Sequence, residues 1–270
     1  MSKTLISIII PTYKRNHKLK KIVDYLVKQC PLKIKIEVII ICEIYKNLGL
    51  NFNYLIKKKN IQLKILTVKK NSNAIKRNKG IENAKGKYLI LLDDDCLPDQ
   101  NFIKDYLKLL KKLNDTEILC GSVKYLNSKI KKENFTRYRQ SRHFINTNNY
   151  VSRKINLPAT NIVTMNMGMK NSRLLKKNKY FNEDFGGYGF EDYEFGFRLI
   201  KNGFSFLPSK PLVYHLDERN YRSYLNKIYF LSRYSVTSLK KINHHSWENT
   251  IYFKIENNFF VNLFSKIKLI

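Results

Sequence analysis

Three consecutive carboxylates end an apolar run, and they are the side chains of this sequence best suited to chemistry. Residues 88–92 read Tyr-Leu-Ile-Leu-Leu, and Asp93, Asp94 and Asp95 follow directly. Neighbouring carboxylates repel one another unless a cation or a hydrogen-bond network neutralises them. At the end of a strand in an α/β sheet, such a cation would lie where ligands normally bind. A turn in which aspartate caps the next helix is the alternative that the run alone leaves open.

A second acidic pair follows a glycine-rich loop. Glu191 and Asp192 come directly after residues 185–190 (FGGYGF), at the start of a segment with helical spacing. The N-terminus of a helix stabilises an ionised carboxylate, and an ionised carboxylate beside a sugar hydroxyl can accept its proton. Glycine also lets a backbone approach a sugar closely. An acidic helix cap is the structural alternative.

Apolar periodicity predicts the elements that would hold these groups. Continuous β-branched runs predict buried strands, and apolar residues at helical spacing predict helices between them. The expected strands are residues 5–10, 37–42, 63–68, 88–92, 118–123, 162–169, 204–207 and 212–215. The expected helices are residues 17–30, 73–84, a helix that Pro98 opens, 191–201 and 221–242. This alternation predicts an α/β fold with a mainly parallel sheet flanked by helices.

The composition favours a folded and strongly basic protein. The 270 residues carry a net charge of +30, from 51 Lys+Arg against 21 Asp+Glu, and 43% are hydrophobic. Nucleic acid, an anionic membrane surface and phosphate-rich small molecules all suit such a charge, and a general bias towards lysine produces the same balance.

The sequence also bears on the compartment. The cysteines show no CxxC spacing, and no run reaches the roughly 18 apolar residues of a membrane span. The apolar run at residues 5–10 is too short for a signal peptide. We therefore expect a cytoplasmic protein with reduced cysteines.

Three segments resemble family-2 glycosyltransferases of the GT-A fold, which is a Rossmann-like α/β fold. Residues 7–15 (SIIIPTYKR) look like the opening strand of the family, and residues 73–99 look like its second signature, which ends in the DxD metal motif. Residues 181–203 resemble an acceptor-side motif shared with galactosyltransferases and chondroitin-type polymerases. Three motifs in the family's order are more specific than any one of them.

The resemblance implies a divalent metal, Mn²⁺ or Mg²⁺, on Asp93, Asp95 and His215. Asp93 and Asp95 match the two aspartates of DxD and Asp94 matches the spacer, although the triple aspartate leaves this register ambiguous. Related galactosyl-type transferases place a third ligand at the position of His215, just past a short strand. The metal would neutralise the charge that builds on a diphosphate leaving group.

The resemblance also assigns roles to the acidic pair and to the loop before it. Asp192 would be the catalytic base of a single in-line displacement that inverts the anomeric carbon. Gly187, Tyr188 and Glu191 would contact the acceptor, with Tyr188 standing where the family usually has tryptophan.

Donor contacts are expected near the end of the first strand and around the aspartates. The implied residues are Pro11, Thr12, Tyr13, Arg15, Glu43, Arg77, Asp93 and Asp94. Glu43 departs from the family, which often has an aspartate beside the uracil at that point. Arg77 is equally suited to pair with the aspartates.

Together these features predict a metal-dependent inverting glycosyltransferase. It would move a sugar from a nucleotide sugar, with UDP favoured, to a glycan or lipid-linked acceptor in bacterial surface polysaccharide synthesis. Two alternatives are a basic nucleic-acid-binding protein, although no recognition motif for nucleic acid is present, and a nucleotidyltransferase.

The expected domains are a GT-A domain at residues 1–220 and a basic, aromatic, helical region at residues 221–270. The first would divide into a nucleotide-binding half, 1–123, and an acceptor-binding half, 124–220. The second either lies as a peripheral element on the anionic inner face of the cell membrane or packs on the catalytic domain.

Overall fold

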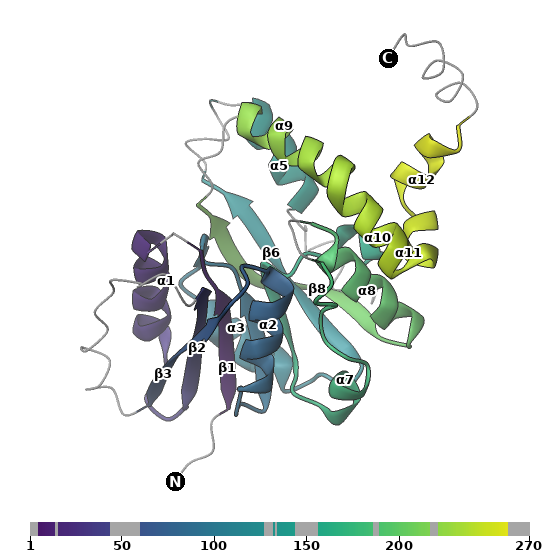
Figure 1. Ribbon diagram of the computed structural model, residues 1–270. Coiled ribbons are helices and arrows are strands. Elements are labelled where there is room, and N and C mark those ends of the chain that lie inside the picture. The colour runs from purple at the N-terminus through teal and green to yellow at the C-terminus, as the bar shows by residue number, and fades with distance from the viewer. Residues whose placement is uncertain are drawn as a thin grey trace.

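The computed structural model describes residues 5–13, 16–43, 60–126, 132, 134–143, 156–185, 189–216 and 221–258. Within them, one eight-stranded sheet has the order β3-β2-β1-β4-β7-β6-β8-β5 (Figure 1). Its strands are β1 Ile6–Pro11, β2 Ile36–Glu43, β3 Ile61–Val68, β4 Tyr88–Leu92, β5 Cys96–Pro98, β6 Glu117–Tyr125, β7 Asn166–Lys170 and β8 Ser205–His215.

Helices flank the sheet and continue beyond it at the C-terminal end. The α-helices are α1 Asn16–Gln29, α2 Asn73–Glu82, α3 Phe102–Leu110, α5 Asn134–His143, α7 Arg173–Lys177, α8 Glu191–Lys201, α9 Tyr221–Phe230, α10 Val236–Ile242, α11 His244–Glu248 and α12 Ile251–Glu256. A short 3-10 helix, η2, covers Ala159–Asn161. The π-helical segment η3, Leu231–Ser235, joins α9 and α10 into one long helix (Figure 1).

The first half of the sheet is parallel and the second half is mixed. β1 pairs in parallel with both β2 and β4, and β2 pairs in parallel with β3. β7 then runs antiparallel to β4 and to β6, while β6 and β8 are parallel. The short strand β5 closes the sheet antiparallel to β8. Because β7 is antiparallel to β4, β7 begins at the edge where β1 and β4 end.

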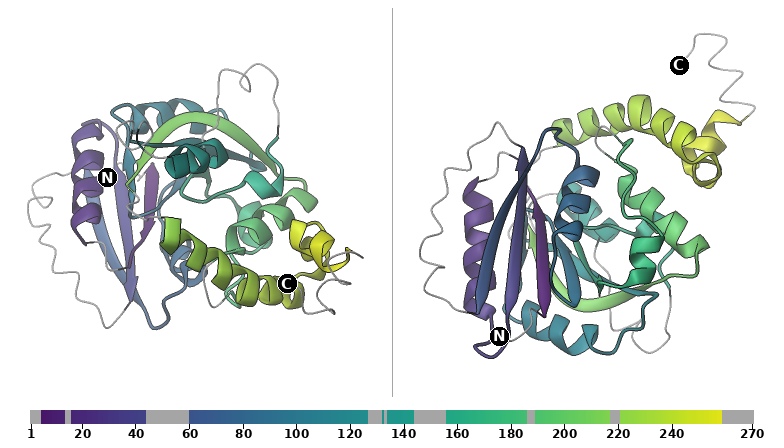
Figure 2. Two further views of the ribbon diagram at one scale, coloured as in Figure 1. Left: turned by 90° about the horizontal axis from the view of Figure 1, so that it is seen from above. Right: turned by 60° about the horizontal axis from the view of Figure 1, so that its bottom comes forward.

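The core has two layers because side chains alternate along the buried strands. Ile8 and Ile10 pack with α1 and α3 on one face, whereas Ile9 packs with α2 on the other. Figure 2 shows α1 and α2 on opposite faces of the sheet. α2 lies so close to β1 that a Cβ at Gly80 would meet Ile9 Cγ2 at 2.4 Å. That close approach brings the side chains of α2 to the ends of the strands.

The structure differs from the expected elements at several points. Pro98 does not open a helix but ends β5, and the helix begins at Phe102. The two short strands expected at 204–207 and 212–215 form the single strand β8, which passes an irregularity opposite Gly121 and Ser122. α5 was not expected, because its sequence NFTRYRQSRH has no apolar periodicity.

Among the residues that the structure describes, no helix is both long enough and apolar enough to cross a membrane.

Candidate active site

The three aspartates after β4 have different partners. Asp94 faces the end of β1, where its Oδ2 accepts hydrogen bonds from Thr12 Oγ1 at 2.8 Å and from the Tyr13 main-chain N–H at 3.1 Å. The contact forms because β1 and β4 are parallel neighbours and end at the same edge. Asp94, expected as the spacer of DxD, therefore holds two of the expected donor residues in place. Asp93 and Asp95 are directed to other groups.

Arg77 joins the aspartates to the acidic pair at the start of α8. Its Nη2 donates to Asp93 Oδ1 at 3.1 Å, and its Nη1 donates to Asp192 Oδ1 at 3.0 Å and to Glu191 Oε1 at 3.2 Å. The guanidinium is held over the ring of Phe181, with Cζ 5.4 Å from the ring centroid. Arg77 is only 2% exposed. One buried cation thus pairs with carboxylates from two separate motifs.

The charges around Arg77 shift the ionisation of this group of side chains. Burial alone would lower the pKa of the guanidinium, but the nearby negative charges of Asp192, Asp93 and Glu191 raise it above its usual value. Burial raises the pKa of Asp93 to about 7; Arg77 opposes the rise, and the charge of Asp95 adds to it. Burial, with the charge of Asp192, also raises the pKa of Glu191. The cluster therefore holds more negative charge than one arginine can neutralise, which suits a site for a further cation.

Asp192 is oriented by donors on both of its oxygens. The Thr164 hydroxyl donates to Oδ1 at 2.8 Å and the Thr164 main-chain N–H donates to Oδ2 at 3.1 Å. Oδ1 also receives Arg77, so Oδ2 keeps capacity to accept a further hydrogen bond. Thr164 comes from the segment that enters β7, whose Met165 carbonyl accepts from the Asp93 N–H at 3.3 Å. The carboxylate therefore has a fixed orientation at the edge where β4 ends.

The start of α8 depends on an unusual backbone turn. Gly189 has φ +96° and Phe190 has φ +70°. The left-handed conformation of Phe190, the N-cap residue, costs about 1–2 kcal/mol relative to ordinary backbone. Its ring lies 6.0 Å from that of Tyr193 and 5.8 Å from that of Tyr252, each edge to face. These contacts hold the turn that places Glu191 and Asp192.

Asp95 and His215 lie together where β5 begins and β8 ends. Asp95 Oδ1 is 3.5 Å from His215 Nε2, and both side chains are buried. Cys96 joins them: one ligand atom from each of the three residues lies within 4.8 Å of the others. Carboxylate, imidazole and thiolate are all ligands for divalent transition metals, so this set fits such an ion. Asp93, expected as a ligand, is not part of this group and engages Arg77 instead.

The remaining expected site residues are placed as follows. Pro11 ends β1, and the ring of Tyr13 is 40% exposed with Lys76 Nζ 5.4 Å from its centroid. Glu43 ends β2 on the same edge. Arg15, Gly187 and Tyr188 lie outside the described residues.

Thr164, Lys76 and Cys96 are not among the site residues expected from the sequence. Lys76 is 1% exposed, and its Nζ donates to the Thr12 carbonyl at 2.8 Å. This hydrogen bond fixes the backbone that follows β1. A lysine on the buried face of α2 was the available signal, because lysine is rarely buried without a partner. Thr164 had no such signal, since it lies in the segment expected as a strand, 162–169, where a threonine does not by itself indicate a site.

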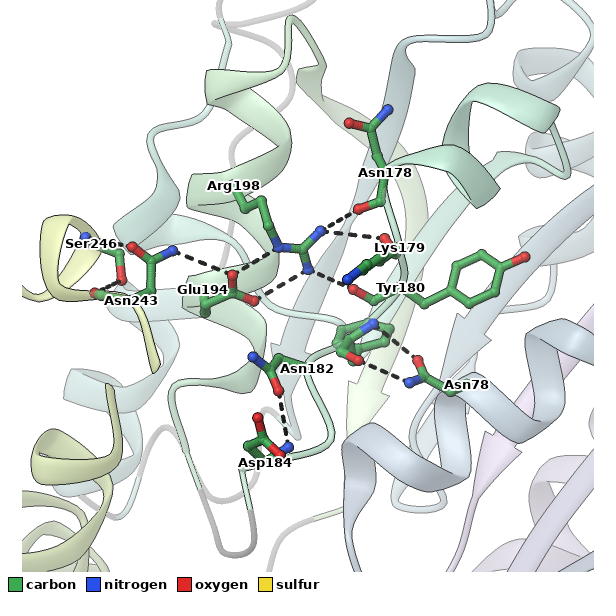
Figure 3. Close-up of polar contacts among 11 residues, drawn as sticks. Asn78, Asn178, Lys179, Tyr180, Asn182, Asp184, Glu194, Arg198, Asn243 and Ser246 are labelled. Atoms are coloured by element: carbon green, nitrogen blue, oxygen red, sulfur yellow. Dashed lines mark hydrogen bonds and ion pairs between the residues drawn. The ribbon is translucent and has the colours of Figure 1, made fainter. Parts of the chain in front are cut away.

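A second arginine braces α8 and the chain before it. Arg198 Nε donates to Glu194 Oε1 at 2.8 Å, and its other nitrogens donate to the carbonyls of residues 178–180. Figure 3 shows this arginine between the carboxylate and those carbonyls, with Asn243 of the C-terminal region on the other side of Glu194. Asn78 holds the same segment to α2, because its amide pairs with both main-chain groups of Phe181. The helix that carries Asp192 is thus fixed to α2, which carries Arg77.

The C-terminal helices pack on the loop before α8. Phe185 is buried in a small cluster with Leu239 and Trp247, to which Phe190 and Tyr193 add their rings. Tyr193 Oη donates to the Ser246 carbonyl at 3.0 Å. A Cβ at Gly189 would meet Leu231 Cδ1, in η3, at 2.8 Å. Residues 221–258 therefore contact the turn that places the acidic pair.

Comparison with known proteins agrees with this geometry. The family model described as Glycosyl transferase family 2 matches residues 7–172. The chain belongs to glycosyl transferase family 2. The resemblance to this family is confirmed, and the match takes in the first two of the three motifs, with the ends of β1 and β4, Arg77 and Thr164.

Curated relatives of this family-2 chain are larger proteins. Chondroitin synthase of Escherichia coli is 28% identical over 252 residues, which cover 78% of this chain and 34% of that protein. Poly(ribitol-phosphate) beta-N-acetylglucosaminyltransferase TarP of Staphylococcus aureus is 27% identical over 118 residues, which cover 43% of this chain and 36% of that protein. The chain thus spans about a third of the length of these two relatives.

Solved structures match the fold of this family-2 chain. S. aureus TarS 1–349 in complex with UDP-GlcNAc superposes with a TM-score of 0.58 and 18% identity, covering 89% of this chain and 68% of that one. The same TarS segment in complex with UDP gives a TM-score of 0.56 at 18% identity, covering 89% of this chain and 67% of that one. The expected GT-A fold class is confirmed.

Proposed function

We propose that this chain is a metal-dependent inverting glycosyltransferase, which moves a sugar from a UDP-sugar to a glycan or lipid-linked acceptor in bacterial surface polysaccharide synthesis. One observation carries the proposal: Arg77 bridges Asp93 and Asp192, so the DxD motif and the acidic pair share one site. That arrangement puts groups suited to a diphosphate and groups suited to a sugar hydroxyl side by side in a family-2 chain.

Asp95 and His215 would hold the divalent metal, Mn²⁺ or Mg²⁺, with Asp93 able to join them by exchanging Arg77 for the ion. The 3.5 Å between Asp95 Oδ1 and His215 Nε2 supports a shared ion at this point. A bound divalent ion would supply positive charge beside the diphosphate oxygens. Burial raises the pKa of Asp93 to about 7 despite the nearby Arg77, so a bound divalent ion would favour the ionised form of this carboxyl.

Asp192 would act as the base. The acceptor hydroxyl oxygen attacks the anomeric carbon, the bond from that carbon to the diphosphate oxygen breaks, and the electron pair leaves with the nucleoside diphosphate. The hydroxyl proton passes to Asp192 Oδ2, which Thr164 N–H orients from one side. A single displacement of this kind inverts the anomeric centre. Glu191, together with Gly187 and Tyr188, would contact the acceptor.

The nucleotide would lie along the ends of β1 and β2. Pro11, Thr12 and Tyr13 would contact the base and ribose, with Arg15 beside them and Glu43 in place of the family's aspartate. Asp94 supports this surface by bonding Thr12 and the Tyr13 main chain. The half-exposed ring of Tyr13 offers a stacking face. The UDP and UDP-GlcNAc complexes of TarS favour a uridine nucleotide.

The acceptor would be a polymer or a lipid-linked saccharide. Relatives named chondroitin synthase and poly(ribitol-phosphate) beta-N-acetylglucosaminyltransferase support a polymeric acceptor. Residues 1–220 would form the catalytic GT-A domain, with nucleotide-binding (1–123) and acceptor-binding (124–220) halves, and residues 221–270 its C-terminal appendage.

The C-terminal region would also touch an anionic membrane from the cytoplasmic side. Its exposed apolar side chains are Tyr221, Leu225, Ile228, Tyr229, Phe230, Tyr234, Ile251 and Ile255. Its exposed cationic side chains are Arg222, Arg233, Lys241 and Lys254. Apolar and cationic groups on one helix are what a peripheral anchor needs.

Flotation with liposomes tests the membrane contact. The full-length protein should float with anionic vesicles at low salt and stay behind with zwitterionic ones. Tyr229→Asp should reduce flotation, whereas Leu32→Asp, at a 90% exposed position between α1 and β2, should not. If wild-type protein does not float with anionic vesicles, the proposed membrane contact is wrong.

A panel of nucleotide sugars with Mn²⁺ tests the reaction. Release of the nucleoside diphosphate should appear with one UDP-sugar, fall to background in Asp95→Ala, and fall at least a hundredfold in Asp192→Asn. Nucleotide affinity should survive in Asp192→Asn, because that change removes the base and leaves the metal ligands. Asp115→Asn, at an exposed position, is the matched control. Full activity in Asp192→Asn would refute the role of Asp192 as the base. Activity without any divalent ion would refute the metal dependence.

A further inference from the structure

Cys96 brings a thiol into the group formed by Asp95 and His215. Cys96 Sγ lies 3.9 Å from Asp95 Oδ1, and His215 Nε2 lies 3.5 Å from the same oxygen. The side chains are buried, at 0% exposure for Cys96 and 4% for each of the others. Ligands that share one Zn²⁺-sized ion, each about 2.0–2.3 Å from it, lie about 3.2–3.8 Å apart. Small side-chain shifts would therefore bring all three onto one ion.

The backbone places Cys96 and His215 on one face of the sheet. Cys96 stands directly opposite His215 in the antiparallel pair of β5 and β8, so their side chains point the same way. The Leu216 N–H donates to the Asp95 carbonyl at 2.7 Å and fixes the residue before β5. The ring of Tyr125 packs edge to face on His215, with centroids 5.2 Å apart. Two strands and a neighbouring ring thus pre-organise the three side chains.

We propose that Cys96 is itself a metal ligand, and that it makes this site select borderline ions such as Zn²⁺ and Co²⁺ over the hard ion Mg²⁺. The inference rests on the metal site of the proposed function and sharpens it. Thiolate is a soft ligand that binds Zn²⁺ and Co²⁺ well, whereas Mg²⁺ requires oxygen ligands. On binding, the Cys96 thiol loses its proton to solvent and the sulfur donates an electron pair to the ion.

Cobalt is the probe, because a thiolate bound to Co²⁺ gives a charge-transfer absorption band in the near ultraviolet that oxygen and nitrogen ligands do not give. Metal-stripped full-length protein titrated with Co²⁺ should develop this band at one equivalent. Cys96→Ser should lose the band and bind Zn²⁺ about ten- to a hundredfold more weakly, with Mg²⁺ affinity unchanged. Cys120→Ser, at another buried cysteine, should keep the band.

The outcomes separate this inference from the proposed function. If wild-type protein binds Co²⁺ without the band, or if Cys96→Ser retains it, Cys96 is not a ligand and the Asp95–His215 site stands without it. If wild-type protein binds no Co²⁺, or if Asp95→Asn and His215→Ala both bind it as tightly as wild type, the metal site itself is wrong. The wild-type spectrum shows whether sulfur binds the ion even where a variant fails to fold, and Cys96→Ala provides a second test of the sulfur.

Discussion

The Nη1 atom of Arg77 lies 3.0 Å from Oδ1 of Asp192, although 115 residues separate the two along the chain. The same guanidinium reaches Asp93 through Nη2. A cation that draws Asp93 away from Arg77, or a diphosphate that draws Arg77 away from Asp93, therefore changes the charge that Asp192 faces. The carboxylate that follows β4 and the carboxylate that opens α8 are electrostatically connected through one side chain.

Replacing Arg77 should destabilise the protein strongly. Arg77→Met leaves Asp93, Glu191 and Asp192 without their shared cation, and removing one partner of a buried ion pair costs about 3–5 kcal/mol. Arg77→Lys should cost less, because it keeps the charge, but a single ammonium cannot span all three carboxylates. Urea unfolding measures both. Arg222→Met, at an exposed arginine of α9, should leave the unfolding midpoint in place.

Thr164 should act on catalysis through the orientation of Asp192. Thr164→Val keeps the shape of the side chain and removes the hydroxyl that donates to Asp192 Oδ1 at 2.8 Å. We expect kcat to fall about tenfold while the affinity for UDP is unchanged, since hydrogen bonds to charged groups contribute about 1.5–3 kcal/mol. Thr160→Val, at an exposed threonine of η2, should behave as wild type. A raised UDP dissociation constant in Thr164→Val would contradict the assigned role.

Metal-free protein should lose stability as the pH rises from 5 to 8. The pKa of Asp93 is raised to about 7 in the folded protein, against about 3.9 in an unfolded chain. The folded state thus holds a proton that the unfolded state has already released, and the stability from this group is lost as the pH passes through 7. The loss should amount to a few kcal/mol at most. The raised pKa of Glu191 acts in the same direction.

Asp93→Asn is the control for this pH dependence. The variant should show a clearly shallower loss of stability between pH 5 and pH 8, because the titrating group is gone. Added Mn²⁺ should restore stability at pH 8 to the wild-type protein. Equal slopes for wild type and Asp93→Asn would show that burial has not shifted this carboxyl.

Trp247 should matter for transfer although it lies far from the aspartates in sequence. Trp247 is 3% exposed and packs with Phe185 and Leu239 beneath the turn before α8. Trp247→Ala should cost about 3–5 kcal/mol of unfolding free energy and lower kcat, because the turn that places Asp192 loses its support. Ile251→Ala, at a 66% exposed side chain of α12, should change neither quantity. A stable Trp247→Ala enzyme with wild-type kcat would separate the C-terminal helices from the site.

Part of this fold follows directly from the sequence. The continuous β-branched runs predicted β1, β2 and β4, and parallel order then required Thr12 and Asp94 to meet at one edge. β8 was less visible, because Pro208 and Pro211 interrupt its apolar pattern. Both prolines are accommodated beside the irregularity at Gly121 and Ser122, where the ladder with β6 is broken.

The site was predictable only in part, because some of its contacts depend on strand pairing that local sequence patterns do not reveal. The resemblance to the family pointed to Asp95, Asp192 and His215, because carboxylates that follow a strand or begin a helix also serve as ordinary turn and cap residues. No local pattern revealed the contact between Thr164 and Asp192, because it depends on the antiparallel return of β7. Nothing in the sequence distinguished Cys96 from an ordinary buried cysteine, because its position opposite His215 depends on the pairing of β5 with β8.

The position of Arg77 in the chain has a consequence for synthesis. Arg77 in α2 precedes Asp93 by 16 residues, and both belong to the N-terminal part of the chain, which leaves the ribosome first. The growing polypeptide therefore carries a counter-charge before it carries the aspartates. Glu191 and Asp192 are made much later and meet a cation that is already in place. The cation that pairs with Glu191 and Asp192 is therefore synthesised before α8, whereas β8 and the C-terminal helices, which complete the sheet and cover the turn before α8, are synthesised after it.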